Sequence, residues 1–281
     1  RIDSNAPKTF YNIEEKLKSL EEKLKINYNE TQEKAIKGAL NNNITIISGG
    51  PGTGKTTIIN AIVKLYIEKE KLAPVDIMET IALLAPTGRA AKKMNSSTGI
   101  PAYTIHRYLK WYKDSNEFVY NEFNKTHHKL IIVDEVSMID IDLFNALLNG
   151  ISPNVKLILV GDTFQLPSVG PGLVLNDLIE SDFFNYIPLN QIYRQSDNSY
   201  IPFLAKEIKS NDLSEEFLTK KDDYNFVKVD SSNIKSAITQ ITNMSLSKGL
   251  DERNVQVLAP MYKGDAGIDA LNVVLQNIYN P

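Results

Sequence analysis

The sequence predicts an α/β protein in which helices flank a buried parallel sheet. Four short and nearly continuous apolar runs support this, at Ile44–Ile47, Ile81–Ala85, Leu130–Val133 and Lys156–Val160. Each run is followed by turn residues and then by apolar residues at helical spacing. Strands that are apolar on both faces and alternate with helices are typical of a parallel sheet covered on both sides.

The composition excludes several classes of protein. The chain has 281 residues, 42% of them hydrophobic and 23% charged, as in a globular protein with one large or two smaller domains. It has no cysteine and three histidines, which excludes disulfides, thiolate metal sites and cysteine nucleophiles and argues against a zinc enzyme. No apolar run reaches transmembrane length and no signal peptide is recognisable, so we expect a cytoplasmic protein with no membrane partner.

The charge balance says little about partners. A net charge of −3 provides no bulk attraction to nucleic acid, although a local basic groove is compatible with it. Only five of the 31 basic residues are arginines, namely Arg1, Arg89, Arg107, Arg194 and Arg253. Planar, bidentate recognition of phosphate is one reason for a lysine-biased chain to use arginine.

The chain opens on an amphipathic segment. Apolar residues recur at helical spacing over residues 10–25, which predicts a helix packed on the rest of the protein with no chemical role. We expect residues 1–26 to form this helical lead-in. The first residue is Arg1 rather than methionine, which suggests a piece of a longer protein.

The most specific motif follows the first predicted strand. Residues 49–56 read GGPGTGKT, which fits the P-loop pattern G-x-x-x-x-G-K-[ST] between a strand and a helix. Such a loop turns its backbone N–H groups around phosphates, at the positive end of a helix. We expect Lys55 to reach the β- and γ-phosphates of ATP and Thr56 to bind Mg²⁺. The predicted nucleotide-binding residues are Gly50, Pro51, Gly52, Thr53, Gly54, Lys55, Thr56 and Thr57. A glycine turn without chemical function is the less favoured alternative.

Two acids complete the expected nucleotide site. Asp134 and Glu135 directly follow the apolar strand Leu130–Val133. Asp134 is placed to hold Mg²⁺, and Glu135 to accept a proton from the attacking water. Together with the P-loop, this pair predicts an NTPase.

The segments around these motifs resemble superfamily 1B DNA helicases of the RecD type, from about Tyr28 to the end of the chain. The resemblance implies a RecA-like fold and ATP-driven movement along single-stranded DNA in the 5′→3′ direction. It places Gln32 in the Q motif, where the amide reads the adenine edge. It places Gln165, in the segment GDTFQLP, next to the γ-phosphate, and makes Arg194 a catalytic arginine finger.

The same resemblance implies a set of DNA-facing residues at turns that follow predicted strands. These residues are Pro86, Thr87, Arg89, Thr104, His106, Ser168, Val169 and, in the second half of the chain, Pro260. Without the resemblance, most of them would be interpreted as ordinary surface or helix-capping residues.

An aromatic-rich segment separates two of these motifs. Residues 107–123 contain Tyr108, Trp111, Tyr112, Phe118, Tyr120 and Phe123. In the family, a small β-hairpin inserted here, at about 107–128, acts as a pin at the junction where the strands separate. The aromatic side chains could stack on bases or form a small core of the insertion itself, and the sequence does not decide between these alternatives.

We expect a first RecA-like motor domain over 27–200 and an incomplete second one over 201–281. Apolar runs at Phe226–Val229 and Val255–Leu258, with helical patterns at 233–246 and 266–278, predict the start of a second sheet. The later motifs of the family are absent, so the chain resembles a RecD-type helicase truncated before them. We expect such a chain to bind nucleotide better than it hydrolyses it.

The sequence therefore predicts an ATP-dependent DNA helicase or translocase acting in repair or recombination. Its expected partners are single-stranded DNA, duplex with a single-stranded overhang and other repair or recombination subunits. A nucleotide-switched DNA-binding module without unwinding, and an RNA-directed superfamily 1 motor, are the alternatives. Nuclease activity has no support, because no second carboxylate cluster suited to catalytic metals is visible.

Overall fold

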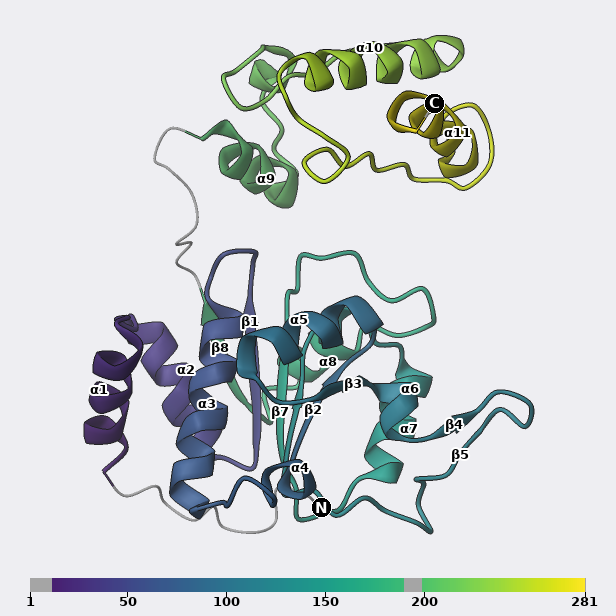
Figure 1. Ribbon diagram of the computed structural model, residues 1–281. Coiled ribbons are helices and arrows are strands. Elements are labelled where there is room, and N and C mark those ends of the chain that lie inside the picture. Colours follow the sequence, from purple (N-terminus) through teal and green to yellow (C-terminus); the bar gives the residue numbers. More distant parts are fainter. Residues whose placement is uncertain (1–11, 190–198, 281) are drawn as a thin grey trace. The chain divides into compact units, whose positions relative to one another are not determined.

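The computed structural model describes residues 12–189 and 199–280 (Figure 1). The chain divides into two compact units, one over residues 1–196 and one over 197–281. The first unit holds the sheet and the second is helical. None of the described helices has both the length and the apolar character needed to cross a lipid bilayer.

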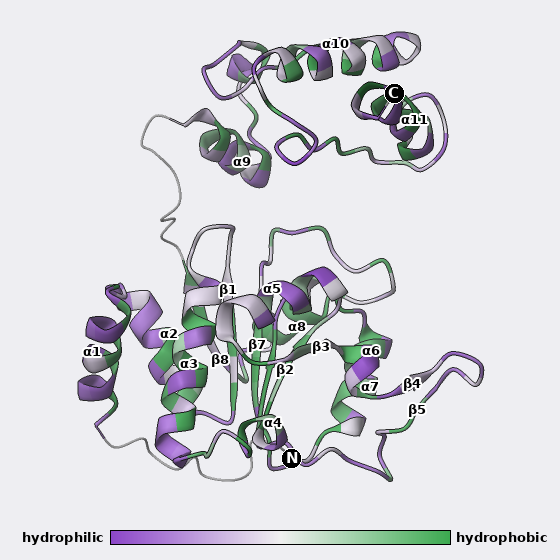
Figure 2. Cartoon of the chain, in the orientation of Figure 1, coloured by the Kyte–Doolittle hydropathy of each residue, from purple (hydrophilic) through white to green (hydrophobic). Residues whose placement is uncertain are grey.

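The first unit is built on a six-stranded parallel sheet with the order β3-β2-β6-β7-β1-β8. The four predicted strands are confirmed, as β1 (Ile44–Gly49), β2 (Ile81–Ala85), β6 (Leu130–Val133) and β7 (Lys156–Gly161). Their central residues are almost completely buried, as continuous apolar runs require. Figure 2 shows β2 and β7 in green, as hydrophobic strands in the middle of the unit.

The two edge strands were not predicted. β3 (Ala102–Thr104) has three residues and is only half-buried, and β8 (Asn185–Leu189) alternates in exposure and contains Pro188. Neither run is continuously apolar. Pro188 is tolerated because β8 pairs on one side only, with β1.

Helices cover both faces of the sheet, and a separate apolar core lies on each face. Helices α1 to α3 contribute to one core and α6 to α8 to the other. In the first unit the helices are α1 (Ile13–Leu24), α2 (Glu30–Asn41), α3 (Lys55–Glu70), α4 (Ile77–Thr80), α5 (Gly88–Thr98), α6 (Ile105–Tyr108), α7 (Ile141–Gly150) and α8 (Val174–Glu180), with a 3-10 turn at Val136–Met138.

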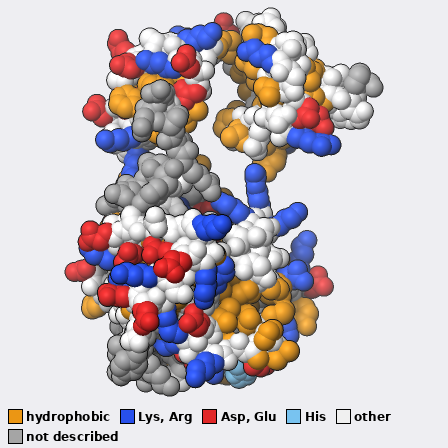
Figure 3. All heavy atoms as spheres, turned by 60° about the vertical axis from the view of Figure 1, so that its left-hand side comes forward, with side chains coloured by type: hydrophobic (Ala, Val, Ile, Leu, Met, Phe, Trp, Pro, Cys, Tyr) orange, Lys and Arg blue, Asp and Glu red, His pale blue; other side chains and the backbone are white. Residues whose placement is uncertain are grey.

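Helix α1 confirms the predicted lead-in helix. Leu17 and Leu20 are buried in the core, and the Lys16 Nζ atom lies 2.7 Å from an oxygen of Glu68 on α3. Over the surface in view in Figure 3, acidic and basic side chains are intermingled, as the small net charge suggests.

The aromatic segment forms the expected hairpin, from β4 (Trp111–Tyr112) and β5 (Glu117–Phe118), which pair antiparallel. Its aromatic residues divide between the two interpretations. Tyr108 is buried, and Phe118 and Tyr120 pack against the core of the first unit. The more exposed members are Trp111, Tyr112 and Phe123.

The second unit contains α9 (Tyr200–Ser210), α10 (Ile234–Ser247) and α11 (Ile268–Tyr279), with 3-10 turns at Glu215–Leu218 and Ser231–Asn233. The two later helical patterns are confirmed by α10 and α11. The strands expected at Phe226–Val229 and Val255–Leu258 are wrong, because residues 199–280 contain no strand. A strand needs a hydrogen-bonded neighbour, and these two runs do not pair, so their alternating apolar side chains stay largely exposed.

Candidate active site

The P-loop lies between the carboxyl end of β1 and the start of α3, as predicted. Gly52 and Gly54 have φ values of 79° and 89°, in the left-handed region that glycine adopts without strain. The Thr53 hydroxyl donates to the Gly50 carbonyl at 2.9 Å. The Lys55 ammonium group donates to the carbonyls of Gly49 and Gly50, at 2.5 and 3.1 Å, so it is folded back over the P-loop.

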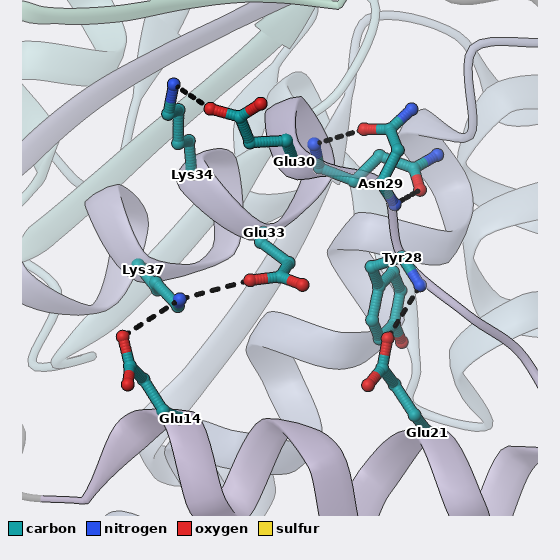
Figure 4. Close-up of polar contacts among 9 residues, drawn as sticks. Glu14, Glu21, Tyr28, Asn29, Glu30, Glu33, Lys34 and Lys37 are labelled. Carbon is teal, nitrogen blue, oxygen red and sulfur yellow. Dashed lines mark hydrogen bonds and ion pairs between the residues drawn. The ribbon is translucent and has the colours of Figure 1, made fainter.

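Gln32 joins helix α2 to the P-loop. With Asn29 it forms a capping box, in which the Gln32 N–H donates to the Asn29 side chain at 2.8 Å and the Asn29 N–H donates to the Gln32 side chain at 3.1 Å (Figure 4). The Gln32 Nε2 atom also donates to the Thr53 carbonyl at 3.0 Å. The side chain is only 6% exposed. The Gln32 side-chain amide, which is expected to read adenine, therefore already uses its oxygen and one N–H in hydrogen bonds within the protein. Its second N–H is left to bind a base.

This contact makes Gly54 a sensitive position. A Cβ atom at Gly54 would lie 2.4 Å from the Gln32 Nε2 atom, and its φ value disfavours any other residue. We expect Gly54→Ala to raise the dissociation constant for ATP at least about tenfold, because the loop must shift. Isothermal titration calorimetry measures the change, with circular dichroism as a check on folding.

Gly99→Ala is the matched control for backbone strain. Gly99 has a φ value of 73° but no atom within 4 Å of the added Cβ, and it lies at the end of α5. The Gly99→Ala variant should lower the free energy of unfolding by about 1 kcal/mol and leave ATP affinity unchanged. Wild-type affinity in Gly54→Ala would show that the loop does not depend on this contact.

The acid pair follows β6 directly. The Asp134 carboxylate accepts a hydrogen bond from the Glu135 N–H at 2.9 Å. Burial and, second, the charge of Glu135 raise the pKa of Asp134 to about 6, against the opposing effects of the Glu135 N–H hydrogen bond and of the charges of Lys55 and Lys93. Glu135 adopts a φ of 55°, and its Oε2 atom is buried with no hydrogen-bond partner among the described residues. Such a group is costly unless a ligand satisfies it.

These residues fit a magnesium ion. Thr56 and Asp134 line the same cavity and offer hydroxyl and carboxylate oxygens, which are the ligands that Mg²⁺ prefers. A divalent ion bound there would also offset the repulsion between the two half-buried, adjacent acids.

Gln165 is held at the edge of the same site. It follows β7, and its side-chain oxygen lies 3.4 Å from the Ser137 hydroxyl, a long contact. Its backbone N–H donates to the Asp162 carbonyl at 3.2 Å, and the buried Asp162 carboxylate accepts from the Phe164 N–H at 3.0 Å. A turn built on Asp162 therefore positions Gln165.

One cavity of about 370 Å³ brings most of the predicted nucleotide residues together. Its walls include Gln32, the P-loop, Asp134, Glu135 and Gln165. The complete lining is Ile26, Asn27, Tyr28, Gln32, Gly50, Pro51, Gly52, Gly54, Lys55, Thr56, Thr57, Lys93, Asp134, Glu135 and Gln165. The P-loop residue Thr53 is buried instead.

Sequence reasoning missed four residues of this lining. Ile26, Asn27 and Tyr28 immediately precede the Q motif, and Lys93 lies within α5. The Tyr28 N–H donates to Glu21 at 2.7 Å, which holds this segment against α1 (Figure 4). Proximity to Gln32 in the sequence is a usable signal for the first three, whereas nothing in the sequence marks Lys93.

Two of the predicted DNA-facing threonines lie at the same edge of the sheet. Thr87 and Thr104 end up at the carboxyl edge of adjacent strands, because Ala85 of β2 is in register with Thr104 of β3. Thr87 caps α5 by accepting from the Ala90 N–H at 3.3 Å, and Thr104 caps α6 by accepting from the Arg107 N–H at 3.2 Å. Pro86 and Arg89 flank Thr87, and both are outside the core.

The remaining predicted contacts are more scattered. His106 packs its ring against Trp111 and Phe118 of the hairpin, with centroids 5.3 and 6.0 Å apart. Ser168 donates to the carbonyls of Gly170 and Gly172, and Val169 is fully exposed on the same loop. Pro260 belongs to the second unit, and Arg194 lies outside the described residues.

Comparison with known proteins identifies the class. A family model described as an AAA domain matches residues 32–171, which include the P-loop, the acid pair and the Gln165 turn. The solved Pif1 helicase of Candida albicans superposes with a TM-score of 0.51 at 19% identity, covering 78% of this chain and 55% of that one. Fold and site together define a P-loop NTPase with a RecA-like sheet.

The curated relatives narrow this class further. The chain is 39% identical over 168 residues to the RecBCD enzyme subunit RecD of Mycolicibacterium smegmatis, covering 54% of this chain and 30% of the relative. It is 33% identical over 252 residues to the ATP-dependent RecD2 DNA helicase of Deinococcus radiodurans, covering 90% and 33%. The chain is similar to RecD-type helicases, and it spans about a third of the length of these two relatives.

Proposed function

We propose that this chain forms the ATP-hydrolysing motor of a DNA helicase that moves 5′→3′ along single-stranded DNA in repair or recombination. One observation carries the proposal: a single cavity places the P-loop, the Asp134–Glu135 pair and Gln165 around one volume. Switch proteins also have a P-loop and an acid. Here Gln165, which follows β7, adds a polar side chain that can respond to the γ-phosphate, beside the P-loop after β1 and the acids after β6.

Each residue then has a defined task. Lys55 leaves the two P-loop carbonyls and binds the β- and γ-phosphates, and Gln165 holds the γ-phosphate from the opposite wall. Glu135 orients the attacking water and accepts its proton through the carboxylate oxygen that otherwise has no partner. Thr56 and Asp134 would hold Mg²⁺, which neutralises phosphate charge when bound. Arg194 supplies a further positive charge as the arginine finger.

The base and the DNA are held at two other places. Gln32 uses its remaining amide N–H, together with Tyr28, to bind adenine. Thr87 and Thr104, with Pro86, Arg89 and His106, bind the phosphates and sugars of single-stranded DNA at the carboxyl edge of β2 and β3. Ser168 and Val169 add further DNA contacts in the first unit, and Pro260 is a separate proposed DNA contact in the second unit. We also propose that the protein is located in the cytoplasm and associates with other repair subunits.

ATP turnover with and without DNA tests the function. The assay uses this chain and the natural polypeptide that carries it, with single-stranded DNA, single-stranded RNA and no nucleic acid. We expect DNA to stimulate hydrolysis in the natural polypeptide, and a duplex with a 5′ overhang to be unwound in preference to one with a 3′ overhang. If the protein binds ATP but DNA does not stimulate its hydrolysis, the helicase proposal is wrong and a nucleotide-switched binding module takes its place. Stronger stimulation by RNA would identify an RNA-directed motor.

A further inference from the structure

Lys93 brings a second cation from an unexpected element into the nucleotide cavity. It lies on α5, the helix that Thr87 caps, whereas Lys55 is the first residue of α3. Among the described residues that line the cavity, Lys55 and Lys93 are the only positively charged ones. The cavity also contains Asp134 and Glu135, and Lys93 interacts electrostatically with Asp134. The Lys93 side chain therefore lines the same cavity as the two acids.

The packing of α5 fixes which face of the helix carries Lys93. Ala91 and Met94 are buried, and Lys92 and Lys93 between them are both exposed. Of these two neighbouring lysines, Lys93 alone is part of the cavity wall. Helix α5 packs against α3 and β2, so its position relative to the P-loop is set by the core.

We infer that Lys93 binds the terminal phosphate of the nucleotide and so links the α5 helix to the nucleotide state. The inference rests on the proposed function, because it names a further binding residue of the same site. Lys93 reaches the cavity from α5, whereas the P-loop that surrounds the inner phosphates lies between β1 and α3. An ammonium group in this position gains most from a γ-phosphate, which carries the largest negative charge. A nucleoside diphosphate lacks this group and gains little.

The position of Lys93 has a consequence for DNA binding. Thr87 lies at the amino end of α5, about 1.7 helical turns from Lys93, at a turn proposed to hold DNA. An attraction between the γ-phosphate and Lys93 acts on α5, and α5 begins at this turn. ATP and ADP should therefore differ in their effect on affinity for single-stranded DNA, and that difference should depend on Lys93.

The test compares Lys93→Gln with its neighbour Lys92→Gln. Both variants remove one positive charge from an exposed position on α5. Only Lys93→Gln changes a residue that lines the cavity. We expect Lys93→Gln to weaken ATP binding about 10- to 100-fold and ADP binding no more than about twofold, with the charge-preserving Lys93→Arg recovering most of the loss. Lys92→Gln should change neither affinity. Calorimetry with a non-hydrolysable ATP analogue and with ADP gives these values.

Two outcomes would overturn the inference. Equal loss of ATP and ADP affinity would make Lys93 a general electrostatic or structural residue, and unchanged affinity for both would remove it from the site. Neither outcome contradicts the proposed function. That function fails separately if the unmodified protein does not bind ATP, or if DNA never stimulates ATP hydrolysis.

Discussion

Replacing Glu135 by glutamine is expected to slow ATP hydrolysis by about 100- to 10,000-fold, which is the usual contribution of a general base. The change keeps the size of the side chain but removes its ability to accept a proton from water. ATP affinity should stay within about twofold of the wild-type value, because Glu135 does not contact the P-loop phosphate groove through any described hydrogen bond. Steady-state and single-turnover hydrolysis with saturating DNA measure the loss.

The control for this variant is Asp142→Asn, which neutralises an exposed acid in the first turn of α7, outside the cavity. It should hydrolyse ATP at the wild-type rate. If Glu135→Gln keeps more than about a tenth of the activity, another group activates the water, and the role of Glu135 must be reassigned.

Replacing Lys55 by alanine is expected to weaken the binding of both ATP and ADP at least about tenfold and to abolish DNA-stimulated hydrolysis. One charge-assisted hydrogen bond to phosphate contributes about 1.5 to 3 kcal/mol, and Lys55 is placed to reach two phosphates. The loss should include ADP because the β-phosphate is common to both nucleotides. In this respect Lys55 differs from Lys93, whose effect should be confined to ATP.

Calorimetry with both nucleotides checks this expectation. Lys18→Ala, which truncates an exposed lysine on α1, controls for the change of net charge. Lys55→Ala with unchanged affinity for both nucleotides would contradict the assignment of the P-loop as the phosphate site. The melting temperature should change little, since Lys55 is half-buried and bonds only to loop carbonyls.

The fold was predictable where burial alone determines the sequence. The four central strands are buried on both faces, so each needs a continuous apolar run, and each was found. The edge strands β3 and β8 bury only part of their surface and carry no such run. The error in the second unit has the same origin, because two short alternating runs do not specify a pairing partner. Pairing depends on residues far away in the chain.

The candidate site was predictable where its residues are adjacent in the sequence. The P-loop and the acid pair are local motifs whose spacing fixes their geometry, and Thr87 and Thr104 belong to turns that directly follow strands. Lys93 enters the cavity only because α5 packs beside α3, and no local pattern encodes that neighbour. The sequence predicts Gln32 as a base-reading residue, but its hydrogen bond to the Thr53 carbonyl is visible only in the tertiary structure.

The strand order has a consequence for how the site is made during synthesis. β1, which carries the P-loop, pairs on one side with β7 through Ile44 and Leu157, and on the other with β8 through Gly49 and Leu189. The ribosome completes the phosphate-binding motif more than 100 residues before either neighbour exists. Such distant pairings close slowly. A nascent chain should therefore acquire nucleotide affinity late and abruptly, when β8 adds the last edge, and ligand capture by ribosome-bound chains would report the moment at which the sheet closes.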